Sequence, residues 1–494
     1  MGQEKSSLSR SDDLRSRQLN TNGISFYKIK EYERAIEEFD KAIELNPIFS
    51  SFYYNKGLAL YDMGRYKESM NECDKAILIN PNNSKYHNTK GLGLFDLKQY
   101  IPAIDEFNKA IELNPHSALY YNNKALALGK LKKYEEAIKF CDKSIFIDPN
   151  DADYYNNKGM ILGKLKRFEE ALKEFDEAIK INPNKAKYYS KAQAYYYLRK
   201  YDKAIEIFNK GIQLYPNDPN YHFRKGKSLY YLCKFEEALE EFNKAIELSP
   251  NDSLFHHEKG LILCKLLKYE DAIHEFDISH VLDPHDAKVL FNKALALQHV
   301  ERLQEAIESF DSAIQLNPND SEFYHQKGNS LFDLGLFEES IVEFNKALEL
   351  NPNDPQIFND KGNSLFELKQ FKIALKMYKK AVKLNGNDNM FYYNIALSLF
   401  EMNCLDKALL YLNKSLDIDP NDPDVCRSKA LVLFHYKHFS QALLFCNKAL
   451  SLNPADYRAK SLKIKILTSF DGRIIFNYFL FFLFIKKIHK FNLN

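Results

Sequence analysis

The chain has 494 residues, of which 45% are hydrophobic and 28% are charged. Its 69 basic and 67 acidic residues leave a net charge of +2, which excludes a general electrostatic attraction to nucleic acid or to an anionic membrane surface. The seven cysteines form no CxxC pair and no metal-ligand spacing. We expect Cys73, Cys141 and Cys446, which stand where other parts of the chain carry Phe, to be small buried residues in a reducing compartment.

Residues 1–15 form a polar leader that we expect to be disordered. The leader lacks the apolar segment of a secretory signal peptide. Its first residues, MGQEKS, match the pattern in which Gly2 is myristoylated once Met1 is removed. No polybasic cluster follows to provide a second membrane signal, so a lipidated Gly2 and a plain polar leader are both open interpretations.

From Ser16 to Asp456 the sequence repeats itself every 34 residues. Prolines recur at this interval, except that Pro216 follows after 33 residues and Gly386 replaces one proline. With these residues placed at position 32, the chain has thirteen repeats, numbered here 1 to 13. The repeats begin at Ser16, Ser50, Ser84, Ala118, Ala152, Lys185, Pro219, Ser253, Ala287, Ser321, Pro355, Asn389 and Pro423.

Small and large residues keep fixed positions within each repeat. Position 8 is Gly or Ala, position 20 is Ala or Ser, position 27 is Ala, Ser or Gly, and position 24 is usually Phe and otherwise Cys (Cys73, Cys141 and Cys446), Tyr or Leu. Positions 4, 8 and 11 share one helix face, and positions 20, 24 and 27 share one face of a second helix. The proline ends the second helix, and the recurrent Pro-Asn-Asp provides a turn and a cap for the next helix. Each repeat is therefore predicted to be an antiparallel helical hairpin.

This pattern of Gly/Ala, Ala, Phe, Ala and Pro in a unit of 34 residues resembles the tetratricopeptide repeat (TPR). The resemblance implies an all-α fold, a right-handed α-solenoid superhelix of thirteen TPR units over residues 16–456. Residues 457–470 are then expected to form a capping helix. Two departures stand out. The usual Trp at position 4 is Tyr, Phe or His, and the usual Leu at position 7 is Lys in nearly every repeat.

The lysines at position 7 allow two interpretations. In the first, their methylenes cover apolar neighbours while the ammonium groups stay in water, giving a solvated edge column. In the second, they form a cationic stripe for acidic partners. Acidic pairs on the second helices, such as Glu135-Glu136 and Glu236-Glu237, balance the charge and favour the first interpretation.

The resemblance also implies that positions 2, 5, 6, 9, 12 and 13 of the first helices line a concave groove. Asparagine recurs there, and an amide offers the acceptor and donors that match an extended peptide backbone. The candidate peptide-binding residues are Asn55, Asn123, Asn157, Asn292 and Asn394 at position 6, Asn122 and Asn156 at position 5, and Asn329 and Asn363 at position 9. Arg224 and Glu258 interrupt the column. The alternative is that asparagine is merely frequent in this chain and tolerated on exposed helix faces.

A more specific TPR function, the carboxylate clamp for chaperone C-termini, is not matched by any three successive repeats. Asn329 and Asn363 fit the clamp pattern, but His325 and Asn359 stand where lysine is required. Asp424 and Ser428 replace the basic pair of the third repeat, and we therefore expect the clamp's ligands not to be partners.

Nothing in the sequence predicts catalysis, a metal or a cofactor. Glycine falls chiefly at position 8, inside helices, and not in loops that could cradle phosphate. His256 occupies the aromatic position 4, and the neighbouring histidines have no paired ligand at metal spacing. We expect the chain not to be an enzyme.

Residues 471–494 form a hydrophobic and basic tail. Its apolar run, Ile474 to Ile485, is twelve residues, short of the ~20 that a membrane-spanning helix needs. Three interpretations remain open: a hydrophobic cap on the last repeat, a membrane-surface or short tail anchor, and translated non-coding sequence.

The sequence as a whole predicts a non-catalytic cytoplasmic scaffold that binds extended peptides or partner proteins in its groove. The alternatives are an adaptor attached to a membrane through Gly2 or the tail, and a non-catalytic subunit of an enzyme complex.

Overall fold

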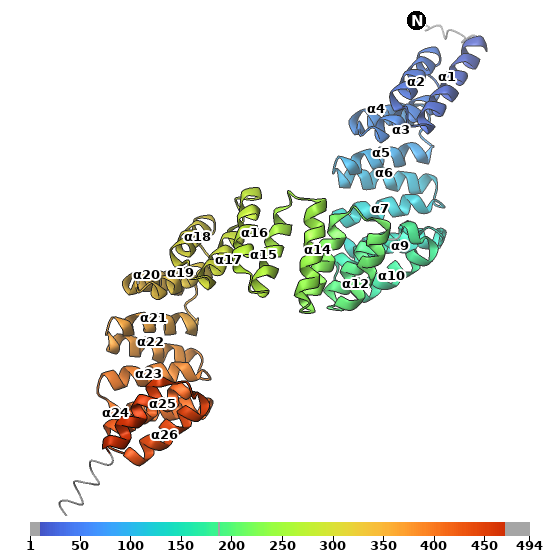
Figure 1. The fold of residues 1–494 in the computed structure, drawn as a ribbon. Coiled ribbons are helices and arrows are strands. Elements are labelled where there is room, and N and C mark those ends of the chain that lie inside the picture. The colour runs from blue at the N-terminus through green and yellow to red at the C-terminus, as the bar shows by residue number, and fades with distance from the viewer. Residues whose placement is uncertain (1–9, 186–187, 470–494) are drawn as a thin grey trace, which may run out of the picture. The chain divides into compact units, whose positions relative to one another are not determined.

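The computed structural model describes residues 10–185 and 188–469 of the chain (Figure 1). Apart from one short 3-10 helix, Pro183–Lys185, the regular elements of the described residues are α-helices arranged as successive antiparallel hairpins, which confirms the predicted all-α fold. Two compact units divide the chain, Met1–Pro250 and Asn251–Asn494. Within each unit every hairpin packs against the preceding and the following one.

The hairpins follow the repeats of the sequence. The first helices are α1 (Arg10–Lys28), α3 (Ser50–Asp62), α5 (Ser84–Asp96), α7 (Ala118–Lys130), α9 (Ala152–Lys164), α11 (Tyr188–Tyr197), α13 (Pro219–Tyr231), α15 (Ser253–Lys265), α17 (Ala287–His299), α19 (Ser321–Asp333), α21 (Pro355–Glu367), α23 (Asn389–Glu401) and α25 (Pro423–His435). The second helices are α2 (Tyr32–Leu45), α4 (Tyr66–Ile79), α6 (Tyr100–Leu113), α8 (Tyr134–Ile147), α10 (Phe168–Ile181), α12 (Tyr201–Leu214), α14 (Phe235–Leu248), α16 (Tyr269–Leu282), α18 (Leu303–Leu316), α20 (Phe337–Leu350), α22 (Phe371–Leu384), α24 (Leu405–Ile418) and α26 (Phe439–Leu452).

The turn between repeats caps the next helix as the Pro-Asn-Asp pattern predicts. The Asp218 carboxylate, for example, accepts a hydrogen bond of 3.0 Å from the backbone N–H of Asn220 in the first turn of α13. Such a bond satisfies one of the helix's unpaired N–H groups. The residues capping a first helix in this way are Asn83, Asp151, Asp218, Asp252, Asp286, Asp320, Asp354, Asp388 and Asp422.

The turn within each repeat has a feature that the sequence pattern did not reveal. Position 15 lies in the left-handed region, with φ between 57° and 79°, although only Gly64 and Gly335 are glycines there. The other residues are Lys30, Lys98, Lys132, Lys166, Arg199, Cys233, Leu267, Glu301, Lys369, Asn403 and Lys437. A side chain in this conformation is strained by about 1 kcal/mol, and the hairpin geometry imposes that strain in repeat after repeat.

Small residues permit the close contact between the two helices of a hairpin. The ring of Phe107 packs so tightly on Gly91 that a Cβ atom there would lie 2.6 Å from the ring. The alanines flanking such a ring in sequence, as Ala238 and Ala245 flank Phe242, are fully buried. Position 8 therefore sets the spacing of the hairpin, and position 24 fills the space around that contact.

The lysines at position 7 are not the solvated column that the sequence favoured. Eight of their side chains are only 10% to 24% exposed. Lys327 bridges Glu343 of its own repeat (3.0 Å) and Asp311 of the repeat before it (2.7 Å). Burial alone would lower the pKa of Lys327, but the hydrogen bonds to these carboxylates raise it. Six of these lysines, Lys56, Lys90, Lys158, Lys191, Lys293 and Lys327, pair with an acid of the repeat before them and so tie one repeat to the next.

The structure differs from the sequence-based expectation at the N-terminal end of the repeats and agrees with it at the C-terminal end. Helix α1 begins at Arg10, so residues 10–15 are helical and not part of a disordered leader. The Asn46 amide fixes this extension by donating a hydrogen bond of 3.1 Å to Asp13. At the other end, residues 457–469 are helical, and Ala459, Leu462 and Ile466 pack on the core of the last repeat, as expected of a capping helix.

None of the helices in the described part of the chain combines the length and the apolar character needed to cross a membrane. Gly2 and the tail 471–494 lie outside the described residues, so the lipidation site and the three interpretations of the tail stay predictions.

Candidate functional site

The first helices bring positions 5 and 6 of successive repeats into direct contact. The side chain at position 6 forms a hydrogen bond with position 5 of the repeat before it, at donor–acceptor distances of 2.8 to 3.2 Å. These bonds join Asn55 to Asn20, Asn123 to Asn88, Asn157 to Asn122, Arg224 to Tyr189, Asn292 to His257, Asp360 to His325, Asn394 to Asn359 and Ser428 to Tyr393. We call this set the inter-repeat ladder.

The predicted asparagines are therefore brought together, but with one another. Asn122, Asn123 and Asn156 are buried, whereas Asn55, Asn157, Asn292 and Asn394 are half-buried. An amide has two N–H donors and a carbonyl acceptor with two lone pairs. One ladder bond therefore leaves part of its hydrogen-bonding capacity unused. The ladder's first consequence is structural, because it fixes the register between neighbouring first helices.

Arg224 does not interrupt the column as the sequence suggested. Its Nε atom donates a hydrogen bond of 3.2 Å to the Tyr189 hydroxyl. This bond takes the place of the bond between two asparagines. The recurrence of asparagine does not reveal this substitution, because the signal is any donor and acceptor spaced 35 residues apart.

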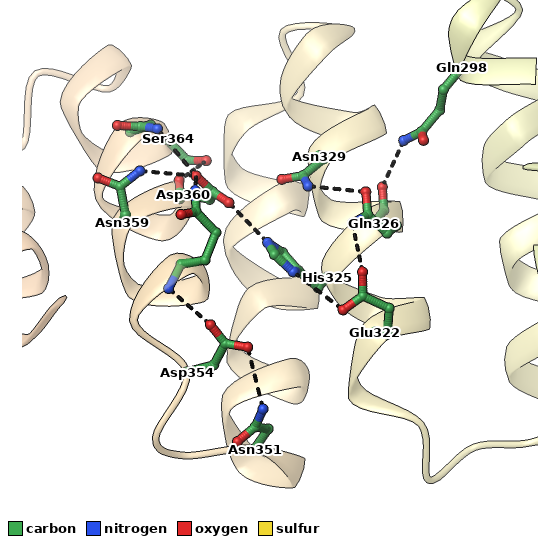
Figure 2. A network of polar contacts seen from close by, with 12 residues as sticks. Gln298, Glu322, His325, Gln326, Asn329, Asn351, Asp354, Asn359, Asp360 and Ser364 are labelled. Carbon is green, nitrogen blue, oxygen red and sulfur yellow. Dashed lines mark hydrogen bonds and ion pairs between the residues drawn. The ribbon is translucent and has the colours of Figure 1, made fainter. Parts of the chain in front are cut away.

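Asn329 and Asn363, at position 9, lie in a polar network across repeats 10 to 12. Figure 2 shows Asn329 beside Gln326 in this network. Asn329 donates to Gln326 at 3.3 Å, and the Asn363 carbonyl accepts from the Tyr378 hydroxyl at 2.9 Å and from Asn394 at 3.3 Å. Both side chains are half-buried. They thus belong to the same connected surface as the ladder.

His325 is the centre of this network, where its ring lies between α19 and Asp360 of α21 (Figure 2). Its Nε2 atom is 2.9 Å from the Asp360 carboxylate, and its Nδ1 atom is 3.9 Å from Glu322. Burial alone would lower the pKa of His325, but the hydrogen bond to Asp360 and the nearby charge of Glu322 raise it to about 9. The residue is therefore a cation at neutral pH, and its charge is already matched by an acid of the next repeat.

Three buried histidine–carboxylate pairs resemble general acid–base pairs in chemistry but not in placement. His87, His222 and His256, all at position 4, bond Glu106, Glu241 and Glu275 at 2.6 to 2.7 Å. Burial alone would raise the pKa of Glu241, but hydrogen bonds from His222 and Lys225 lower it. Each pair joins the two helices of one hairpin, and its recurrence at one repeat position marks a packing element.

The comparison with known families agrees with this architecture. Models described as tetratricopeptide repeat match residues 50–83, 84–117, 118–151, 152–185, 186–218, 219–252, 287–320 and 359–423, and models described as TPR repeat match residues 23–64 and 328–369. The chain belongs to the tetratricopeptide repeat family. No curated protein sequence matches it significantly.

Solved structures with a similar fold include Cut9–Hcn1 of the APC/C (16% identity, 92% of this chain and 96% of that chain, TM-score 0.43). Yeast Tom70 is 19% identical over 94% of this chain and 97% of its own, with a TM-score of 0.37. YrrB, described as a TPR protein with an unusual peptide-binding site, is 26% identical over 38% of this chain and 97% of its own, with a TM-score of 0.33. These are similarities of fold, and no shared partner follows from them.

Proposed function

We propose that the chain is a non-catalytic interaction scaffold whose first helices bind extended peptide segments or partner proteins. The observation that carries the proposal is the inter-repeat ladder, because within each of the two units its bonds hold first helices of neighbouring repeats in register. The family resemblance puts positions 2, 9 and 13 on the same helix surface, and their residues differ from repeat to repeat. A repeated frame with variable flanking residues suits the recognition of a chain that runs along several repeats.

The half-buried asparagines contribute to this function as secondary contacts. Asn55, Asn157 and Asn292 each donate one N–H to the ladder, and an amide carries a second donor, whereas Asn394 donates to both Asn359 and Asn363. We propose that this remaining capacity serves a peptide backbone. The groove has no complete carboxylate clamp, since His325 is matched by Asp360 and Arg427 pairs with Asp424 and Asp456. Chaperone C-termini are accordingly not proposed as partners.

Affinity capture of the full chain with chemical crosslinking and mass spectrometry tests the proposal. We expect stable protein partners, crosslinked mainly to the first helices. A matched pair of variants separates the two helix surfaces: Leu119→Glu on α7 should weaken capture, and Leu78→Glu on α4 should not, although both leucines are exposed (47% and 84%). Crosslinks confined to the second helices, or a lack of any partner, would contradict the groove as the binding surface.

A further inference from the structure

A hollow opens beside the ladder between repeats 5 and 6. It encloses about 640 Å³, within the range of ~300–1,000 Å³ that is usual for ligand pockets. It lies among α9, α10 and α11, and its walls combine apolar or aromatic side chains with a few polar ones. The lining residues are Gly159, Met160, Gly163, Lys164, Lys166, Phe168, Phe175, Tyr189, Ser190, Gln193, Ala194 and Tyr197.

The hollow exists because repeat 5 lacks a side chain at position 12. Most repeats carry an aromatic residue there, such as Phe332 and Phe366, but repeats 4 and 5 carry Gly129 and Gly163. A Cβ atom added to Gly163 would meet no heavy atom within 4 Å, so the space is open at that point. On the far side, the wall of the hollow is formed by side chains of α11, among them Tyr189 and Tyr197.

The rim of the hollow is aromatic and basic. The rings of Phe168 and Tyr197 stack with centroids 5.2 Å apart, and Tyr197 is 52% exposed. Lys164 and Lys166 are exposed, and none of the described residues that line the hollow is acidic. The basic character extends through the turns of repeats 4 to 6, which carry Lys130, Lys132, Lys133, Lys164, Lys166, Arg167, Arg199 and Lys200.

We propose that this hollow binds an acidic peptide segment that inserts one aromatic side chain. The inference rests on the proposed scaffold function and adds the class of ligand. The aromatic side chain fills the space left by Gly163 and packs against Phe168, Tyr197 and Met160. Carboxylates that flank it in the peptide pair with Lys164 and Lys166, and such charge complementarity selects acidic over basic segments.

Fluorescence anisotropy with the full chain provides the test. The probes are three short labelled peptides: one with a central Phe flanked by Glu, one with the Phe replaced by Ala, and one with the Glu residues replaced by Lys. We expect the first to bind at least about tenfold more tightly than the other two, a difference of ~1.4 kcal/mol. Its affinity should also fall as the salt concentration rises.

Two variants address the hollow itself. Gly163→Phe should fill it with the aromatic side chain that other repeats carry at position 12, and should weaken binding of the first peptide at least about tenfold, whereas Gly163→Ala should leave the space open. Lys164→Glu with Lys166→Glu changes only exposed residues and should weaken binding comparably even if Gly163→Phe fails to fold. Asp333→Lys, at position 13 of repeat 10, is the control and should have no effect.

The outcomes separate this inference from the scaffold function. Equal binding of the first peptide to the wild-type chain and to the lysine variant would overturn the hollow as its site, and so would failure of all three peptides to bind. If partners are captured by the full chain and neither Gly163→Phe nor the lysine variant reduces their binding, the hollow is wrong and the scaffold stands. A lack of any captured partner contradicts the scaffold function itself.

Discussion

Repeats 4 and 5 have the same hairpin structure as repeats 10 and 11, but the two pairs carry opposite charges at position 13. At position 13, repeats 4 and 5 carry Lys130 and Lys164, whereas repeats 10 and 11 carry Asp333 and Glu367. At position 12 the contrast is between glycine and phenylalanine. The positions that set the helix contact, 8, 20 and 27, carry only Gly, Ala or Ser in both regions. The difference shows that the packing of a hairpin constrains one face of each helix and leaves the other free to specify a ligand.

Repeats 4 and 10 also differ in the contacts of the lysine at position 7. Lys327 in repeat 10 pairs with two carboxylates, but Lys124 in repeat 4 lies 3.8 Å from the centroid of the Phe140 ring. Burial lowers the pKa of Lys124, whereas the acids around Lys327 raise the pKa of that lysine. At position 7, stability in repeat 10 therefore depends more on charge, and stability in repeat 4 depends more on apolar contact.

The largest expected effect concerns position 24. Phe344→Ala in repeat 10 should lower the free energy of unfolding by ~3–5 kcal/mol, because the ring is fully buried and leaves a cavity. Cys141→Ala at the same position of repeat 4 removes one sulfur atom and should cost only ~1 kcal/mol. Urea unfolding followed by circular dichroism measures both. Equal losses of unfolding free energy in the two variants would contradict the prediction that the size of the side chain at position 24 determines how much the core stabilises each hairpin.

The second prediction concerns pH. The pKa of His325 lies above its ordinary value of 6.5, at about 9, because Asp360 and Glu322 favour the charged ring. The pair therefore contributes its full stability below about pH 6.5 and loses it as the pH rises through 9. We expect the unfolding free energy to fall by ~2–3 kcal/mol over this range. His325→Asn should remove most of this fall, and an unchanged pH profile in the variant would contradict the assignment.

The third prediction uses the lysines at position 7. Lys327→Met leaves Glu343 and Asp311 without their shared cation and should cost ~2 kcal/mol. Lys124→Met replaces a partly desolvated ammonium group on an aromatic ring by an apolar side chain, and should change stability by less than about 0.5 kcal/mol. Thermal unfolding of the two variants at low and high salt gives the comparison. A larger loss in the Lys124 variant would reverse the proposed contrast.

The smallest effect is expected in the turns. Lys132 in repeat 4 has φ of 62°, and Gly335 in repeat 10 has φ of 79° at the same position. Lys132→Gly should therefore stabilise the protein by ~0.5–1 kcal/mol, and Gly335→Ala should destabilise it by about 1 kcal/mol. Changes of the same sign in both variants, measured by denaturant titration, would show that backbone strain does not decide stability there.

Much of the fold could be predicted from the sequence because the signal is repeated. Glycine or alanine at position 8, phenylalanine at position 24 and proline at position 32 recur so often that the period, the hairpin and the helix ends follow from local physical chemistry. The departures lie where a neighbour decides the outcome. Helix α1 extends back to Arg10 because Asp13 meets Asn46, 33 residues away.

The candidate site was predicted only in part. The sequence placed the asparagines on the first helices and at the same repeat positions. It did not show that Asn123 bonds Asn88, because a contact across 35 residues depends on how two hairpins stack. The ion pair between Lys327 and Asp311 could not be predicted either, because Asp311 belongs to the preceding repeat and the contact depends on how the two hairpins stack.

The sequence by itself thus determined the repeat, the hairpin and the membership in an α-solenoid family, since these depend on side-chain size and helix periodicity within about 34 residues. Only the tertiary structure decided which polar groups pair between repeats and where the stack leaves space. The hollow beside Gly163 illustrates the difference. A missing side chain is visible in the sequence, but whether a neighbouring hairpin closes the gap depends on the packing of α11 against it.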